Sequence, residues 1–316
     1  MKALHCWLLT EGAHGMISQV EGLANSLNTT FDHQTIKLSS FFKLLPPSLT
    51  PKSEGVFNFN ELMKNNKNYP DLLISCGRKS VVPSIVIKKY LKSNFKNNIK
   101  NIHIQDPKVS PKNFDAIITP KHDNVIHSDN IIQSVGALHY LNESEVTNQN
   151  SGEVVVTFIL GGPNKYYKFN KKDLETHFSL LDRIKEIKKI NVIASRRTPK
   201  SIFDHFHLKY NNNKFNFDFS LNKRNYTNAY SEASHILVTC DSTSMISEAA
   251  ITGKPLYVAK LSSFKNDYRF KKFLENFKEL GIIRIFEGTL EHWTYEKLYE
   301  SKRVANKIVE KLKLYS

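Results

Sequence analysis

The chain has 316 residues, and 45 Lys and Arg against 30 Asp and Glu give it a formal net charge of +15. Its length suits two domains of ordinary size or one large one, because single cores stop growing near ~250–300 residues. With 40% hydrophobic and 24% charged residues, the composition is that of a globular protein and excludes a disordered chain. No stretch approaches the ~18 apolar residues that a spanning helix requires, so we expect no integral membrane protein.

Other compositional features indicate where the protein works. The three cysteines, Cys6, Cys76 and Cys240, form no CxxC pair and lie in apolar runs, so we predict buried thiols in a reducing compartment and no structural zinc. The short apolar run 3–9 is typical of a first strand and not of a signal peptide, so we predict a cytoplasmic protein. The enrichment in Lys and Asn is typical of an AT-rich genome. Compositional drift and attraction to phosphates or to an anionic membrane both remain explanations of the charge, whereas no nucleic-acid module is evident.

Short β-branched runs alternate with amphipathic helical stretches along the chain. Strands are predicted at 3–9, 35–38, 72–76, 102–104, 116–119, 131–134, 154–160, 191–194, 215–217, 235–239 and 256–259. Helices are predicted at 16–28, 80–92, 170–189, 199–209, 226–233, 243–252, 268–280 and 294–313. Repeated βα units predict parallel sheets with helices on both faces.

A polar stretch at 142–152 separates two halves that each hold five or six predicted strands. The predicted fold class is therefore α/β, with two doubly wound Rossmann-like domains that face each other across a cleft. We place the N-terminal domain at 1–145 and the C-terminal domain at 153–293. We expect the last segment, 294–316, to form a helix that packs back on the N-terminal domain.

In doubly wound sheets ligands bind at the carboxyl ends of the strands, so the loops that follow strands are candidate sites. The first such loop holds Gly12, His14 and Gly15 and leads into a helix that carries Gln19. Its glycines let backbone N–H groups approach a ligand, and an imidazole there can act as a general base. A tight turn with a surface histidine explains the same residues.

Two loops in the second half also combine turn residues with charge. Gly161 and Gly162 follow the strand 154–160, where they indicate either close approach of a ligand or an ordinary turn. The segment 195–200 supplies two hydroxyls (Ser195, Thr198), two guanidinium groups (Arg196, Arg197) and a lysine at the start of a helix. Such a cluster is typical of an anion site, although a solvated turn remains the alternative.

The segment 235–259 carries the most chemistry. A strand ends at Asp241, a hydroxyl-rich turn of Ser242, Thr243 and Ser244 caps a helix, and Ser247 and Glu248 follow on that helix. The N–H groups of the turn suit a diphosphate. Capping explains the hydroxyls but not Glu248, whose carboxylate is able to accept hydrogen bonds from two vicinal ribose hydroxyls.

The run from Ser242 through MISEAA to Gly253-Lys254-Pro255 resembles the nucleotide-sugar motif of GT-B glycosyltransferases, above all the lipid-linked N-acetylglucosaminyltransferase of peptidoglycan synthesis. A wider resemblance covers nearly the whole chain. Five motifs occur in one order: CGRKS at 76–80, HIQDP at 103–107, FD…PKHD at 114–123, SRRTP at 195–199 and DS…M.SEA at 241–249. Together they resemble the Elm family of plant mitochondrial-fission factors and bacterial relatives that are described as glycosyltransferase-like.

This resemblance implies a GT-B-like pair of domains with a nucleotide sugar held mainly by the second domain. Carried over residue by residue, it assigns the donor site to Gly161, Gly162, Ser195, Arg196, Arg197, Thr198, Asp241, Ser242, Thr243, Ser244, Ser247 and Glu248. The acceptor side would comprise Gly12, Gly15, Gln19, Gly77, Arg78 and His122. His14 is the expected catalytic base, and Asp106 or Asp123 could serve in its place.

The leading hypothesis is a GT-B-type glycosyltransferase that moves a sugar from a nucleotide-diphosphate donor to a hydroxyl on a cell-envelope glycan or a lipid-linked acceptor. No Asp-x-Asp motif occurs in the chain, so we expect neither metal nor other cofactor. The alternative is a non-catalytic scaffold that recruits a partner to a membrane, as in the plant fission factors. An epimerase would need a second acid–base pair, which we do not identify.

A membrane contact is a separate hypothesis. The segment 39–47, SSFFKLLPP, combines two aromatic side chains with a lysine, and a lysine-rich helix at 80–92 belongs to the same predicted domain. Aromatic anchors with a basic rim suit peripheral docking to an anionic leaflet, at the inner face of the cytoplasmic membrane. An ordinary core helix formed by this segment is the explanation that we favour slightly.

Overall fold

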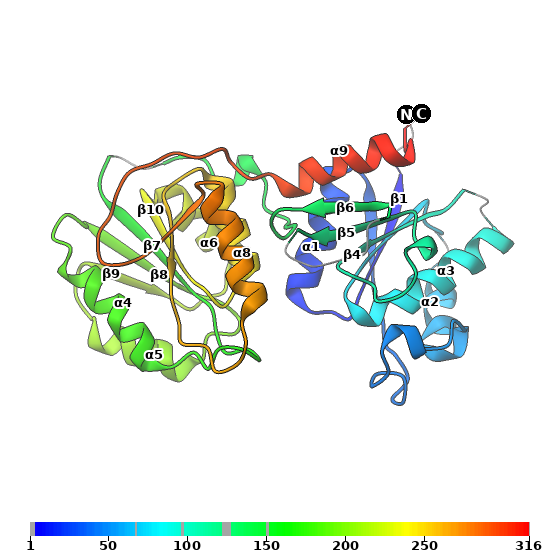
Figure 1. Ribbon diagram of the computed structural model, residues 1–316, viewed down its shortest axis with the longest axis horizontal. Coiled ribbons are helices and arrows are strands. Elements are labelled where there is room, and N and C mark those ends of the chain that lie inside the picture. Colours follow the sequence, from blue (N-terminus) through cyan, green and yellow to red (C-terminus); the bar gives the residue numbers. More distant parts are fainter. Residues whose placement is uncertain (1–3, 67, 96–97, 122–127, 150–151, 316) are drawn as a thin grey trace. The chain divides into compact units, whose positions relative to one another are not determined.

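A computed structural model of the chain describes residues 4–66, 68–95, 98–121, 128–149 and 152–315 (Figure 1). The chain divides into two compact units. Unit 1 comprises Met1–Tyr140 and Tyr299–Ser316, and unit 2 comprises Leu141–Leu298. The polar stretch after residue 141 belongs to unit 2, where Glu145 pairs with Lys223 (2.5 Å).

Within its described residues, unit 1 contains one sheet of six parallel strands in the order β2-β1-β3-β4-β5-β6. The strands are β1 (His5–Thr10), β2 (Thr30–Thr35), β3 (Leu72–Cys76), β4 (Lys100–Ile104), β5 (Ala116–Pro120) and β6 (Ile131–Ser134). The main helices are α1 (His14–Ser26), α2 (Phe59–Asn65), α3 (Val81–Asn94) and α9 (Glu300–Leu312). The chain runs from β1 to β2 on one side and returns to β3 on the other, so the topological switch point lies between β1 and β3.

Alternation along the strands of unit 1 builds two cores. Cys6 and Leu8 point to one face of the sheet and pack with α1 and α9. Trp7 and Leu9 point to the opposite face and pack with α2 and α3. Strands buried on both faces give continuous apolar runs, which is why β3 and β5 are evident in the sequence, whereas β4 also buries Asn101 and His103.

The C-terminal helix α9 is part of unit 1, as Figure 1 shows. The buried side chain of Glu300 accepts a hydrogen bond from the Val135 N–H (2.6 Å), and Ser301 Oγ donates to the carbonyl of His139 (2.9 Å). Gly22 of α1 lies against the carbonyl of His139, where a Cβ would overlap it. These contacts join the last residues of the chain to the segment that precedes unit 2.

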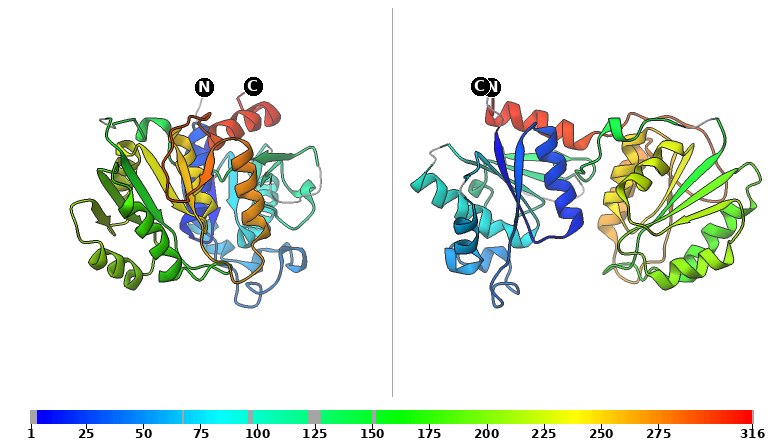
Figure 2. Two further views of the ribbon diagram at one scale, coloured as in Figure 1. Left: turned by 60° about the vertical axis from the view of Figure 1, so that its left-hand side comes forward. Right: turned by 180° about the vertical axis from the view of Figure 1, so that it is seen from behind.

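The part of unit 2 that the structure describes forms a second sheet of six parallel strands, in the order β12-β11-β10-β7-β8-β9. Figure 2 shows the two units from two further sides. Its strands are β7 (Val155–Leu160), β8 (Lys189–Ala194), β9 (Phe215–Asp218), β10 (His235–Thr239), β11 (Leu256–Ala259) and β12 (Ile283–Ile285). Its helices are α4 (Lys171–Arg183), α5 (Lys200–Lys209), α6 (Lys223–Glu232), α7 (Thr243–Ala249) and α8 (Tyr268–Glu279). The switch point of this sheet lies between β7 and β10.

The two doubly wound α/β sheets confirm the predicted fold class. Two edge strands depart from the sequence prediction. The strand predicted at 35–38 lies instead at Thr30–Thr35, and β12 was not predicted. An edge strand has a neighbour on one side only, so the polar sequence TFDHQT of β2 is tolerated there and gives no apolar signal.

The segment 39–47 does not form the core helix that we favoured. It folds into turns between β2 and α2, and the side chains of Phe41 and Leu44 are 68% and 84% exposed. The basic face predicted for the helix at 80–92 is also smaller than expected. Lys88 turns toward Asp115 and pairs with it (2.6 Å), and part of the chain at 96–97 lies outside the described residues.

All three cysteines are free and buried, as predicted. Burial raises the pKa of the Cys6 and Cys240 thiols to about 12, so these thiols are not reactive nucleophiles. Among the described residues, no helix has both the length and the hydropathy needed to cross a membrane.

Candidate functional site

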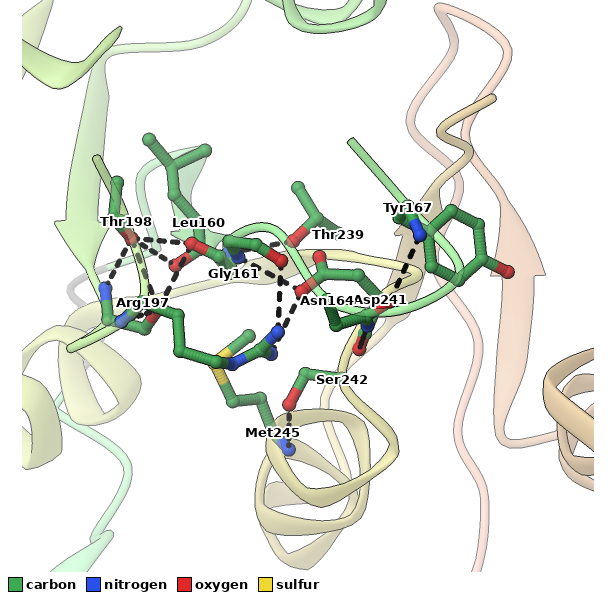
Figure 3. Close-up of polar contacts among 12 residues, drawn as sticks. Leu160, Gly161, Asn164, Tyr167, Arg197, Thr198, Thr239, Asp241, Ser242 and Met245 are labelled. Carbon is green, nitrogen blue, oxygen red and sulfur yellow. Dashed lines mark hydrogen bonds and ion pairs between the residues drawn. The ribbon is translucent and has the colours of Figure 1, made fainter. Parts of the chain in front are cut away.

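The residues that follow β7 and β10 meet at the switch point of unit 2 (Figure 3). Gly161 and Gly162 follow β7 directly, and the turn that begins at Cys240 follows β10. Parallel neighbouring strands end at the same edge of a sheet, which is where doubly wound folds bind ligands. The fold therefore brings two of the predicted loops together.

A buried carboxylate, Asp241, joins these loops to the start of α5. Asp241 Oδ2 accepts hydrogen bonds from the Gly162 N–H and from Arg197 Nη2, both at 2.9 Å. Arg197 Nη1 also donates to the Gly162 carbonyl (2.9 Å). Burial raises the pKa of Asp241, and the charge of Arg197 opposes this rise without cancelling it. We call the group of Gly161, Gly162, Arg197 and Asp241 the clasp.

The clasp changes the interpretation of the two glycines. We expected Gly161 and Gly162 to leave room for a ligand. A Cβ on Gly161 would instead overlap the carboxylate of Asp241, and one on Gly162 would overlap the carbonyl of Arg197. Both glycines are buried, so internal packing requires them whether or not a ligand binds.

The hydroxyls after β8 are also engaged within the protein. Thr198 is buried, and its Oγ1 donates to the carbonyls of Leu160 and Gly161, while Ser195 Oγ donates to the Gly161 carbonyl at 3.0 Å. Arg196 and Arg197 are both exposed, but the Arg197 guanidinium is bound to Asp241 and to the Gly162 carbonyl. The expected phosphate site at this turn thus keeps one guanidinium group outside the clasp, that of Arg196.

The turn after β10 keeps part of its predicted role. Ser242 Oγ accepts a hydrogen bond from the Met245 N–H and caps α7. Ser247 is buried, and its hydroxyl donates to the Thr243 carbonyl at 2.8 Å, so it is used inside the helix. The half-buried hydroxyls of Thr243 and Ser244 make no hydrogen bond with the described part of the chain. These two hydroxyls and the backbone of the turn form the polar surface at this edge.

Glu248 lies one helical turn further along α7 and is half-buried. Its Oε2 accepts a hydrogen bond from the hydroxyl of Tyr226 (2.8 Å), which also contacts the hydroxyl of Tyr230 (2.7 Å). Burial raises the pKa of Glu248 to about 7, and the bond from Tyr226 opposes the rise. Within the described residues Oε1 has no hydrogen-bond partner. The carboxylate therefore has one oxygen fixed and one available.

Tyr226 and Tyr230 were not identified from the sequence. They occupy positions i and i+4 on α6, so their rings lie on one face of that helix. This spacing in a polar helix just before β10 was the available signal. Asn164 was also missed as a site residue, and its side chain donates to the Asp241 carbonyl (3.1 Å).

The loop at the switch point of unit 1 holds the expected acceptor-side residues. The Gly12 N–H donates to Thr10 Oγ1 (3.1 Å), and Gln19 Nε2 donates to the Gly15 carbonyl (3.1 Å). His14 is the first residue of α1 and is exposed, with its ring centroid 6.1 Å from that of Tyr140. An exposed imidazole at the carboxyl edge of a sheet is accessible to a substrate.

The loop after β3 is shaped by two predicted residues. Gly77 has a φ of +86°, and a Cβ there would lie 2.6 Å from Met16 Sδ. Arg78 donates to the carbonyls of Lys43 (2.7 Å) and Leu45 (2.8 Å), so it holds the segment 39–47 in place. This structural role was not expected for Arg78.

Asp106 is a weaker candidate base than His14. Its carboxylate accepts from the Lys108 N–H (2.9 Å) and pairs with Lys108 Nζ (2.5 Å). Burial would raise its pKa, but the bonds and charge of Lys108 outweigh burial, so the pKa lies below the ordinary value. The third candidate base, Asp123, and the acceptor-side residue His122 both lie outside the described residues.

Two doubly wound parallel α/β units in one chain define a protein of the GT-B fold class. A family model described as mitochondrial fission ELM1 matches residues 14–312, and the chain belongs to this family. It is 29% identical to an uncharacterized protein of Rickettsia prowazekii (strain Madrid E), over 98% of this chain and 99% of that protein. It is 24% identical to the mitochondrial fission protein ELM1 of Arabidopsis thaliana, over 78% of this chain and 65% of that protein.

Solved structures agree on the fold. MurG of Acinetobacter baumannii matches with a TM-score of 0.54 at 12% identity, over 98% of this chain and 92% of that chain. MnaA of S. aureus, solved with UDP, also matches with a TM-score of 0.54 at 12% identity, over 98% and 89%. The family resemblance inferred from the five motifs is thus confirmed, and the structural likeness confirms the GT-B-like fold.

Proposed function

We propose that the protein is a glycosyltransferase that moves a sugar from a nucleotide-diphosphate donor to a hydroxyl acceptor. The observation that carries this proposal is the arrangement at the switch point of unit 2. There Glu248 offers one carboxylate oxygen without a hydrogen-bond partner in the described chain, one helical turn from the hydroxyls of Thr243 and Ser244. The structural similarity to MurG and to MnaA with bound UDP supports a nucleotide-sugar ligand for this fold.

Unit 2 would offer a binding partner for the diphosphate and for the ribose of the nucleotide-sugar donor. The diphosphate would accept hydrogen bonds from Thr243, Ser244 and the N–H groups of the turn, with Arg196 as the nearby cation. The Glu248 carboxylate would accept hydrogen bonds from the two ribose hydroxyls. Asp241 and Arg197 would not contact the donor but would hold the loops in the shape that it requires.

Unit 1 would supply the acceptor side and the base. As the acceptor oxygen bonds to the anomeric carbon, the bond from that carbon to the diphosphate breaks and the acceptor proton passes to His14. The turn at 242–244 and Arg196 would stabilise the departing diphosphate. Gly12, Gly15, Gln19, Gly77 and Arg78 would shape the acceptor side.

The proposal includes no metal and no other cofactor. Among the described residues, no group of three or more His, Cys, Asp or Glu side chains is arranged to hold a metal ion. The cationic group Arg196 and the backbone N–H groups of the turn would supply the positive potential that the leaving group needs. A chelator is therefore expected to leave the reaction unchanged.

We propose an acceptor on a cell-envelope glycan or on a membrane lipid. A lipid-linked acceptor would require a cytoplasmic protein that binds peripherally at the inner face of the cytoplasmic membrane. The net charge of +15 favours association with such an anionic surface.

A non-catalytic scaffold is the second candidate, and the clasp favours it in one respect. Gly161, Gly162 and Arg197 have structural roles, so their presence does not require a ligand. A scaffold has no such use for the unpartnered oxygen of Glu248. Nucleotide binding therefore distinguishes the two candidates.

The test is a thermal-shift screen followed by calorimetry with uridine, guanosine, cytidine and thymidine diphosphate sugars. A ligand that binds only the folded state at about 100 times its Kd stabilises it by about 2.7 kcal/mol, which is readily seen. We expect Glu248→Gln to weaken binding, and Glu279→Gln, an exposed residue on α8, to leave it unchanged. We expect His14→Ala to bind the donor but not to transfer the sugar. If none of the donors binds, the transferase proposal is wrong and the scaffold is favoured.

A further inference from the structure

The segment between β2 and α2 in unit 1 projects from the sheet (Figures 1 and 2). Several of its apolar side chains are exposed. Phe41, Leu44 and Leu49 are 68%, 84% and 68% exposed. We call the segment 39–50 the apolar loop. Three large apolar side chains this exposed within nine residues are unusual, since scattered single residues are the norm on a soluble surface.

The apolar loop is held in a defined conformation. Arg78 donates to the carbonyls of Lys43 and Leu45, and Thr50 Oγ1 donates to the carbonyl of Pro46 (3.0 Å). Leu45 and Pro47 line a small pocket against the body of the unit. Because the inner residues of the loop are anchored, Phe41 and Leu44 are exposed by the fold itself and not by a lack of structure.

The apolar loop itself carries a lysine and no acidic residue, whereas Lys37 before it pairs with Glu61 (3.7 Å) and the exposed Glu54 follows it. Between Lys37 and Lys52 the chain carries three lysines, including Lys43, and no acidic residue. Lys43 is exposed beside Leu44, and Lys52 Nζ binds Asn113 (3.0 Å) near the end of the same segment. Such a loop matches the interface of an anionic bilayer. Its apolar side chains would enter the boundary between headgroups and acyl chains, and the ammonium groups of the lysines would contact the anionic headgroups.

We propose that the apolar loop is a membrane anchor that inserts Phe41, Leu44 and Leu49 into the interface of an anionic lipid bilayer, with Lys43 and Lys52 against the headgroups. This inference goes beyond the proposed transferase activity and does not depend on it. It assigns the contact to one loop of unit 1 instead of to the overall positive charge.

Vesicle co-sedimentation tests the anchor with the full chain. The probes are vesicles of phosphatidylcholine alone and vesicles of equimolar phosphatidylglycerol and phosphatidylcholine. We expect binding to the anionic vesicles, and at least about tenfold weaker binding for the double variant Phe41→Ser/Leu44→Ser. The matched control is Leu208→Ser, because Leu208 is 79% exposed on α5 of unit 2 and is expected not to matter. Lys43→Gln/Lys52→Gln should weaken binding to anionic vesicles roughly thirtyfold, since each lysine near an anionic surface strengthens binding about fivefold.

A second measurement reports insertion directly. Phe41→Trp places an indole at the loop, and its emission should shift to shorter wavelength when anionic vesicles are added. The proposal is overturned if the full chain does not bind anionic vesicles, or if Phe41→Ser/Leu44→Ser binds as tightly as the unaltered chain. It is also overturned if Leu208→Ser weakens binding equally, or if the loop variant instead converts a dimer to a monomer in sedimentation velocity. Loss of vesicle binding with sugar transfer retained would separate this anchor from the transferase site.

Discussion

The raised pKa of Glu248 predicts that this residue destabilises the folded protein at neutral and alkaline pH. A glutamate with a pKa near 4.5 in the unfolded chain and about 7 in the folded one binds its proton more tightly when folded. As the pH rises from about 4.5 to 7, the unfolded chain loses this proton first, so the free energy of unfolding falls over that window. Each pKa unit corresponds to about 1.4 kcal/mol, so the rise contributes a loss of about 3 kcal/mol.

The perturbation is Glu248→Gln, which keeps the size of the side chain and an oxygen that can accept the Tyr226 hydroxyl, but does not ionise. We expect the free energy of unfolding of the variant to exceed that of the unaltered chain by about 3 kcal/mol more at pH 8 than at pH 4.5. The same substitution should weaken nucleotide binding. A gain in stability together with a loss of binding is the expected signature of a carboxylate that is retained for a ligand.

The assay is urea unfolding across pH 4.5 to 8, followed by the fluorescence of Trp293, which belongs to unit 2. Trp7 lies in unit 1, and chains of more than one domain commonly unfold in separate steps. Glu279→Gln serves as the control, because the side chain of Glu279 is exposed. If Glu248→Gln changes stability by the same amount at both ends of the pH range, Glu248 ionises normally in the folded protein and the reasoning is wrong.

Three further substitutions test other contacts. Tyr226→Phe removes the hydrogen bond that lowers the pKa of Glu248, so calorimetry should show a loss of nucleotide affinity that is larger at pH 7 than at pH 8.5; an equal loss at both would contradict it. Gly162→Ala should lower the free energy of unfolding of unit 2, measured in urea, by at least about 1–3 kcal/mol, because the new Cβ overlaps a backbone carbonyl. Gly15→Ala is the control and should be neutral or stabilising, because nothing lies within 4 Å of its Cβ. Lys88→Met should lower the free energy of unfolding of unit 1 by about 1 kcal/mol, because it leaves the half-buried Asp115 without its cation. The exposed Lys89→Met should have little effect, and equal effects of the two substitutions would show that the pair does not matter.

The sequence predicted the central strands of both sheets well, because strands that are buried on both faces have mostly apolar sequences. Strands β7 and β10 are buried along their whole length and are mostly apolar, with Thr157, His235 and Thr239 as the polar exceptions. The segment 39–47 shows where this reasoning fails. Its apolar residues predicted a core helix, but the segment ends in two prolines, at 46–47, which disfavour a helix. Arg78 also binds two carbonyls of the segment, so turns form instead.

The location of the candidate site was predictable from the sequence. Which of its residues face a ligand and which support neighbouring loops was not. Glycines, hydroxyls and charges after strands identified both switch points, because topology places those loops at one edge. Whether a group faces a ligand or another part of the chain depends on distances between loops far apart in sequence. Arg197 and Asp241 are 44 residues apart, and only the fold shows that they bind each other.

This division of roles changes which residues distinguish an enzyme from a scaffold. The motif residues Gly162, Arg197 and Asp241 support the loops, and either kind of protein needs them in order to fold. Their presence therefore says little about catalysis. Asp241 also has a pKa raised by burial and an Oδ1 without a described hydrogen-bond partner, but that oxygen is buried and Arg197 pairs with the other one. Glu248 is different, because no described cation pairs with it and because its unused second oxygen belongs to a half-buried side chain. A residue that weakens the fold and keeps an unused acceptor at the carboxyl edge of the sheet is best explained by a ligand, so the case for an enzyme depends on Glu248 and not on the larger motif around it.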